Sequence, residues 1–151
     1  MAVKESVQAS RRVGFLLEST TRVVKLSFTK AFKNLGIDIT PEQWVIIDTL
    51  YQAGALTQNE LAQAAYKNAP TVSRIIDKLE DKQFVIREAD SHDRRKTTVR
   101  LTKQGKKTAE KCYPEVYKLR ELSWKNLSDK DYRSLQRILD KVFRNSAEYL
   151  D

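Results

Sequence analysis

The residues best suited to chemistry in this sequence are the cationic side chains of a short polar turn. Residues 90–105 read DSHDRRKTTVRLTKQG, and three adjacent cations, Arg94, Arg95 and Lys96, lie near the middle of this segment. Residues 84–87 form a β-type run before the turn, and residues 97–101 alternate polar and apolar after it. The pattern predicts a β-hairpin whose tip presents guanidinium groups, which suit phosphate or a narrow groove.

The positive charge of the chain is concentrated around this hairpin. The 151 residues carry a formal charge of +8, and the pI is about 9.6. Residues 66–107 contain 12 Lys and Arg against 6 Asp and Glu, whereas the other 109 residues contain 16 against 14. A basic pI alone is common among ordinary solvated domains, so the distribution matters more than the total. A localised cationic segment indicates a nucleic-acid partner.

Other kinds of site lack the residues that they need. The sequence has no glycine-rich phosphate loop and no His-Glu-x-x-His motif. Its one histidine, His92, lies between Asp90 and Asp93, and these three groups on a turn are too few for a metal site, so we interpret them as a solvated turn. The single cysteine, Cys112, lies on the apolar side of its predicted helix, which favours inert packing over redox sensing. We expect neither an enzyme nor a cofactor.

The localisation expected from the sequence is cytoplasmic. One cysteine cannot form an internal disulfide, which fits a reducing compartment. The first apolar stretch is too short and too charged for a signal peptide, and no apolar run approaches the length of a membrane span. We therefore expect no membrane partner.

Helices must position the hairpin, because only 4 Gly and 3 Pro interrupt the chain. Apolar residues at spacings of three and four predict a long first helix over about residues 6–35. Two capping boxes, at residues 40–43 and 57–60, predict the starts of a second helix and of a short third helix, with a short extended piece over residues 55–57 between them.

Three further helix starts follow. Asn68 caps a helix over about residues 69–82, whose apolar stripe is Val72, Ile75, Ile76 and Leu79. Thr102 and Ser128 cap two last helices, and the final one carries an apolar stripe that would be wet on a lone subunit, which predicts a dimer.

A short helix, a turn, a second helix and a basic hairpin together predict a winged helix-turn-helix. The fold class is mainly α with a small β-hairpin wing. The polar outer face of the helix over residues 69–82 suits the major groove, and the hairpin suits the neighbouring minor groove. The candidate major-groove residues are Pro70, Thr71, Ser73, Arg74 and Lys78. Arg94, Lys96, Lys67 and Lys103 are the candidates for the DNA backbone.

The sequence resembles the MarR family of regulators across roughly residues 11–150. Two blocks carry the resemblance: PTVSRIIDKLE at residues 70–80, and Asp93-Arg94-Arg95 followed by LTKQG at residues 101–105. The resemblance implies a homodimer that usually represses a nearby operon. It also implies that Arg95 probes the minor groove, that Asp93 holds the wing and that Arg74 contacts DNA. One departure concerns the glycine that usually follows the recognition helix, because Lys82-Gln83 stands there. We expect Gln83 to be strained or the helix to end differently.

The expected domain organisation is a single MarR-like subunit over residues 1–151. Residues 38–103 form the winged helix-turn-helix region, and residues 1–37 and 104–151 form the long N- and C-terminal dimerisation helices. The resemblance implies a small apolar or phenolic effector, for which Phe15, Trp44 and Tyr113 are pocket candidates, with ordinary core packing as the alternative. The alternative function is a winged-helix protein-interaction module whose basic hairpin meets an acidic partner.

Overall fold

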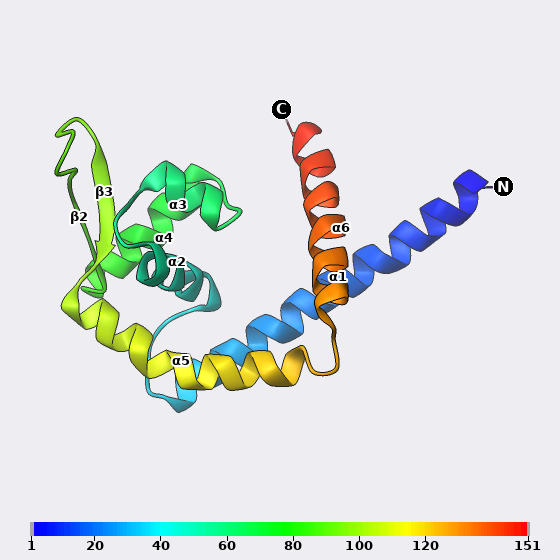
Figure 1. The fold of residues 1–151 in the computed structure, drawn as a ribbon, viewed down its shortest axis with the longest axis horizontal. Helices are drawn as coiled ribbons and strands as arrows, with labels where there is room; N and C mark the ends of the chain where they lie inside the picture. The colour runs from blue at the N-terminus through cyan, green and yellow to red at the C-terminus, as the bar shows by residue number, and fades with distance from the viewer. Residues whose placement is uncertain (1, 151) are drawn as a thin grey trace. The chain divides into compact units, whose positions relative to one another are not determined.

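The computed structural model of the chain describes residues 2–150, with side chains from residue 5 onward. It is mainly helical with a small antiparallel sheet, which confirms the predicted fold class. The elements are, in chain order, α1 (Ala2–Asn34), α2 (Pro41–Ala53), β1 (Leu56–Thr57), α3 (Gln58–Ala64), α4 (Ala69–Asp81), β2 (Val85–Ala89), β3 (Thr97–Leu101), α5 (Lys103–Ser123) and α6 (Asp129–Glu148) (Figure 1). The chain divides into two compact units, Met1–Leu119 and Arg120–Asp151.

The helices begin where local hydrogen bonds satisfy their first backbone N–H groups. Thr40 Oγ1 accepts the N–H of Gln43 at 3.2 Å, and Gln43 Oε1 accepts the N–H of Thr40 at 3.1 Å. Reciprocal pairs of this kind also begin α3 at Thr57 and α6 at Ser128, and Asn68 Oδ1 accepts the N–H of Thr71 at 2.9 Å to begin α4. The predicted starts of these four helices are confirmed.

A three-stranded sheet joins the wing to the helical part of the first unit. The strand order is β1-β3-β2, and both pairs are antiparallel. Val85 pairs with Leu101 at the base of the hairpin and Ala89 pairs with Thr97 near its tip, while Leu56 of β1 pairs with Val99. The extended piece predicted over residues 55–57 is therefore a third strand that anchors one edge of the wing.

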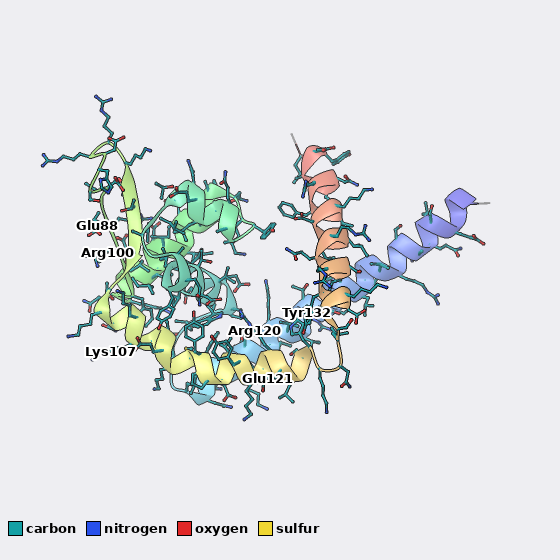
Figure 2. All side chains as sticks on the ribbon, in the orientation of Figure 1. Glu88, Arg100, Lys107, Arg120, Glu121 and Tyr132 are labelled. Atoms are coloured by element: carbon teal, nitrogen blue, oxygen red, sulfur yellow. The ribbon has the colours of Figure 1, made fainter. Side chains whose placement is uncertain are left out.

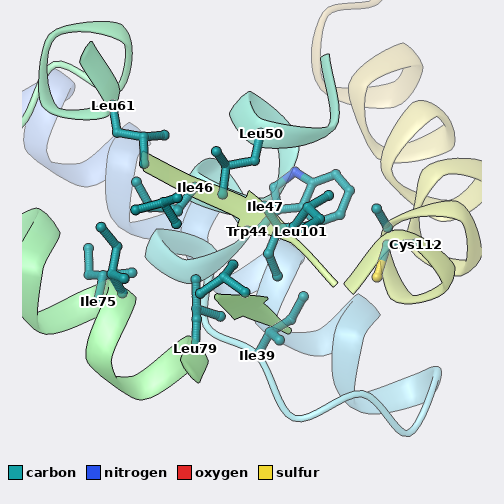
Figure 3. Packing of buried hydrophobic residues seen from close by; sticks show 14 of the residues in the cluster. Ile39, Trp44, Ile46, Ile47, Leu50, Leu61, Ile75, Leu79, Leu101 and Cys112 are labelled. Atoms are coloured by element: carbon teal, nitrogen blue, oxygen red, sulfur yellow. The ribbon is translucent and has the colours of Figure 1, made fainter. Parts of the chain in front are cut away.

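The hydrophobic core lies among α2, α3, α4, α5 and the sheet, with part of α1 packed against it (Figure 3). The apolar stripe predicted for α4 is confirmed, because Val72, Ile76 and Leu79 are 0% exposed and Ile75 is 9% exposed. Full burial of one such side chain contributes about 1.5–3 kcal/mol. The opposite face of α4 is thereby left to solvent.

The end of α4 resolves the question raised by the missing glycine. Gln83 has φ +60°, its N–H donates to the carbonyl of Glu80 at 2.8 Å, and the N–H of Phe84 donates to the carbonyl of Leu79 at 2.9 Å. These two bonds form a Schellman motif. In this motif the residue just after the helix has a left-handed backbone conformation and is usually glycine. The helix thus ends in the usual way, and Gln83 carries the strain.

Among the described residues, none of the helices has an apolar stretch long enough to span a bilayer.

Candidate nucleic-acid interface

The outward face of α4 presents most of the residues predicted for the major groove. Pro70, Arg74 and Lys78 are exposed, whereas Thr71 and Ser73 are half-buried. The spacing of four between Arg74 and Lys78 places both cations on one side of the helix. The positive end of the helix dipole lies at the N-terminal end of α4. The helix therefore offers both charge and hydrogen-bond donors to an anion.

The wing tip is held by the carboxylates of Asp90 and Asp93. Asp90 Oδ1 accepts the backbone N–H groups of Asp93 and His92, each at 2.9 Å, and these bonds lower the pKa of Asp90. Asp93 Oδ1 accepts the N–H of Arg95 at 3.1 Å. The turn closes where the N–H of Asp90 donates to the carbonyl of Lys96 at 2.8 Å. Within residues 5–150 no cluster of His, Cys, Asp and Glu suits a metal ion.

The three cations of the tip are exposed. Arg94, Arg95 and Lys96 lie between β2 and β3, at the end of the hairpin that is farthest from the core. Asp90 and Asp93 accept hydrogen bonds from backbone N–H groups of the turn, and these bonds stabilise the conformation of the turn. Lys103 at the start of α5 is also exposed, and Lys67 in the turn before α4 is half-buried. The unit Met1–Leu119, called the winged unit below, therefore carries two cationic surfaces, one on α4 and one on the wing tip.

One residue of this site escaped the sequence analysis. Arg87, in β2, forms ion pairs with Asp77 and Glu80 of α4; its Nη2 lies 2.7 Å from Asp77 Oδ1, and its Nη1 contacts Glu80 Oε2. The backbone N–H of Arg87 also donates to Glu80 Oε1 at 2.9 Å. Acidic residues at a spacing of three were visible in the sequence, but their alignment with a strand depends on the tertiary fold. A second ion pair, Arg100 with Glu88, lies within the wing (Figure 2).

Trp44 and Tyr113, two of the aromatic pocket candidates, lie in the core. Trp44 is 2% exposed, and the centroid of its ring lies 5.7 Å from that of Phe32 and 5.4 Å from that of Tyr113. The Tyr113 hydroxyl donates to Asp48 Oδ1 at 2.5 Å and accepts from Gln52 Nε2 at 2.9 Å. Burial is the main cause that raises the pKa of Tyr113.

Phe15, the third pocket candidate, lies elsewhere, on the exposed part of α1. Its ring is 59% exposed on α1, and the Arg11 guanidinium lies 5.6 Å from the ring centroid. Phe15 precedes Phe32 by 17 positions on one helix, and a rise of about 1.5 Å per residue separates the two by about 25 Å. The reason is the length of α1, which extends well beyond the part that packs against the core.

Cys112 has the surroundings of a packing residue. Its side chain is 0% exposed, and burial raises the pKa of its thiol from an ordinary value of 9.0 to about 11. The thiol therefore stays protonated at neutral pH. The reactive form of a cysteine is the thiolate, so Cys112 is expected to be unreactive.

Comparison with known proteins identifies relatives of this chain. Residues 39–97 match the model described as the MarR family. From Bacillus subtilis (strain 168), the uncharacterized HTH-type transcriptional regulator YkoM is 26% identical over 151 residues, covering 92% of this chain and 97% of the relative. The uncharacterized HTH-type transcriptional regulator YwaE of the same strain is 30% identical over 105 residues, covering 68% of this chain and only 61% of the relative.

The fold is also found among solved structures. A mutant MarR from E. coli complexed with operator DNA is similar with a TM-score of 0.73 and 26% identity, over 87% of this chain and 93% of that chain. The resemblance thus extends over most of the length of both chains.

Proposed function

Because the chain belongs to the MarR family of DNA-binding transcriptional regulators, we propose that it is a homodimeric repressor that binds a pseudo-palindromic operator and is released by a small ligand. The observation that carries this proposal is the pairing of two exposed cationic surfaces on one winged unit, the outer face of α4 and the tip of the wing. Two reading elements on one unit suit neighbouring grooves of a duplex. This role needs no catalytic chemistry, and it places the protein in the cytoplasm, with the DNA.

We assign different tasks to the two surfaces. On α4, Arg74 and Lys78, with Thr71, Ser73 and Pro70 beside them, face base edges and phosphates of the major groove. On the wing, Arg95 enters the minor groove, where width and negative potential are read more than base identity. Asp93 supports Arg95 through the backbone. Backbone contacts are assigned to exposed or half-buried cations: Arg94, Lys96, Lys67 and Lys103.

The proposed dimer is supported by the apolar surface of the long helices. On α6 the side chains of Leu135, Ile138, Leu139 and Val142 are each between 37% and 49% exposed. They recur at spacings of three and four, so they form one stripe along the helix. On α1, Val13, Leu16 and Val23 are about 60% exposed or more. We propose that residues 1–37 and 104–151 of two chains bury these surfaces against each other.

The first test is selection from a randomised duplex pool with the full chain. We expect a two-fold symmetric motif whose half-site centres lie about 10 base pairs apart. If the dimer neutralises about 8 phosphates, the logarithm of affinity falls with the logarithm of salt concentration with a slope of about −7. Failure to recover a symmetric motif would favour the alternative, an interaction module for an acidic partner.

The second test separates the two surfaces by mutation. Arg95→Ala is expected to weaken binding about tenfold across many sequences, because the wing reads groove shape. Arg74→Ala is expected to relax the preference at particular base pairs instead. Lys118→Ala, which removes one exposed charge from α5, is the matched control and should leave sequence preference unchanged. Unchanged operator affinity of Arg95→Ala would remove the wing from the mechanism.

The buried indole of Trp44 is a candidate contact for the effector. Trp44 Nε1 is buried and has no hydrogen-bond partner among the described residues. A small apolar or phenolic ligand with an acceptor group would satisfy this donor. Phenolic acids that release operator DNA and also change tryptophan emission would support this placement. Equal release from wild type and Trp44→Phe would place the effector elsewhere.

A further inference from the structure

One arginine side chain of the wing binds several groups of α4 at once. Arg87 contacts the carboxylates of Asp77 and Glu80, and its Nη2 lies 3.4 Å from the carbonyl oxygen of Ser73. Positions 73, 77 and 80 are spaced by four and three, so they lie on one side of α4 in successive turns. A single guanidinium in β2 therefore lies along about two turns of the recognition helix.

Both the backbone and the side chain of Arg87 are held. Glu80 accepts the backbone N–H through Oε1 and contacts the guanidinium through Oε2. The side chain of Arg87 is 25% exposed and that of Glu80 is 32% exposed, so this pair is less open to solvent than an ordinary surface pair. Charge-assisted hydrogen bonds of this kind are short and directional, and they fix orientation as well as distance.

The other ion pair of the wing does something different. Arg100 in β3 pairs with Glu88 in β2, so this pair links the two strands of the hairpin to each other (Figure 2). Its side chains are 45% and 39% exposed. Loss of Arg100 would remove the same charge from the wing as loss of Arg87, but it would leave every contact with α4 in place.

We propose that Arg87 is a positioning residue for DNA recognition, which sets the direction of the wing relative to α4 so that Arg95 reaches the minor groove while α4 lies in the major groove. This inference rests on the proposed function. From Arg87, β2 continues for two more residues to Ala89, and the turn extends beyond it. At a distance of about 10 Å from Arg87, which is two residues of strand plus part of the turn, a tilt of about 10° would move the tip by about 2 Å. A displacement of that size exceeds the tolerance of a hydrogen bond.

The consequence is an energetic coupling between Arg87 and Arg95. When Arg87 holds the wing, removal of the Arg95 side chain loses a fully formed contact. When Arg87 is absent, the wing samples several directions, and Arg95 contributes less to begin with. Arg74 lies on α4 itself, so its contribution should not depend on Arg87.

A double-mutant cycle on operator affinity tests this coupling, with the operator that the wild-type chain selects. We expect Arg95→Ala to weaken binding about tenfold in the wild-type background and less than about threefold in the Arg87→Ala background. Arg74→Ala should cost the same factor in both backgrounds. In the control background Arg100→Ala, the cost of Arg95→Ala should stay at about tenfold.

Variants of the partners guard against a folding defect in Arg87→Ala. Asp77→Asn combined with Glu80→Gln removes both carboxylate charges while the volumes stay similar, and it should also shrink the cost of Arg95→Ala. Arg87→Lys keeps the charge but lacks the fork of donors, so it should restore the coupling only in part. Melting curves establish that each variant is folded.

Two outcomes would overturn the proposal, and they are distinguishable. If Arg95→Ala costs the same factor with and without Arg87, the wing needs no positioning by Arg87, although the protein is still an operator-binding regulator. If the wild-type chain selects no operator, the proposed function fails and this inference fails with it.

Discussion

Gln83 shows how one residue determines the end of α4. Its φ of +60° lies in the left-handed region, where a side chain normally clashes with the backbone. Gly36 at the end of α1 has φ +68° and the same type of hydrogen bonding, because the N–H of Ile37 donates to the carbonyl of Phe32 at 2.9 Å. The two helix ends share one geometry and differ in the residue that adopts it.

Substitution at these two ends should therefore act in opposite directions. Gln83→Gly relieves the strain and is expected to raise the free energy of unfolding by about 1 kcal/mol, whereas Gly36→Ala should lower it by about the same amount. Urea denaturation of the two variants measures both effects. A loss of stability in Gln83→Gly would mean that the glutamine side chain, rather than the backbone, secures this turn.

At the scale of elements, the junction between the wing and α5 depends on a close backbone approach. The hydroxyl of Thr102 donates to the carbonyl of Gln83 at 2.6 Å and accepts the N–H of Gly105 at 3.0 Å. Gly105 is buried, and a Cβ at this position would lie 2.0 Å from the carbonyl oxygen of Phe84. The start of α5 and the end of the α4 turn thus pack together only because residue 105 has no side chain.

Gly105→Ala is expected to destabilise the fold by about 2 kcal/mol or more, because backbone atoms must shift to make room. Gly14→Ala is the matched control: within one subunit, a Cβ on Gly14 meets nothing within 4 Å, and alanine favours the helix by up to about 1 kcal/mol. Thermal melting of both variants gives the comparison. Equal melting temperatures for wild type and Gly105→Ala would show that the junction relaxes freely.

At the scale of the whole molecule, the apolar stripe of α6 is the feature that favours association of two chains. None of the described residues of α6 is buried within the chain, although its leucines, isoleucine and valine align on one side. Surface of this kind normally marks an interface between subunits. A two-fold dimer would also present two winged units to the two halves of an operator.

A charge placed in this stripe should separate the subunits of the proposed dimer. Leu139→Glu is expected to shift the protein from dimer to monomer and to weaken operator binding by at least about tenfold, because one winged unit reads only half of the site. Gln136→Glu introduces the same charge at an exposed polar position of α6 and should leave the dimer intact. Sedimentation analysis distinguishes the species. A dimer that persists in Leu139→Glu would exclude this stripe as the contact.

The sequence by itself determined the starts of four helices, α2, α3, α4 and α6, and the class of the fold. A capping box involves residues three positions apart, and the α4 stripe follows from helical periodicity, so both are legible without tertiary contacts. The blocks at residues 70–80 and 93–105 were enough to indicate the family, which the comparisons then confirmed.

The tertiary structure alone decided which distant residues meet. It brought Arg87 to Asp77 and Glu80, paired β1 with β3, and placed Trp44 and Tyr113 in the core while Phe15 stayed far along α1. Such contacts depend on how elements pack and on the direction in which each side chain leaves its element. Local pattern does not contain that information, because many packings are compatible with one series of helices and strands.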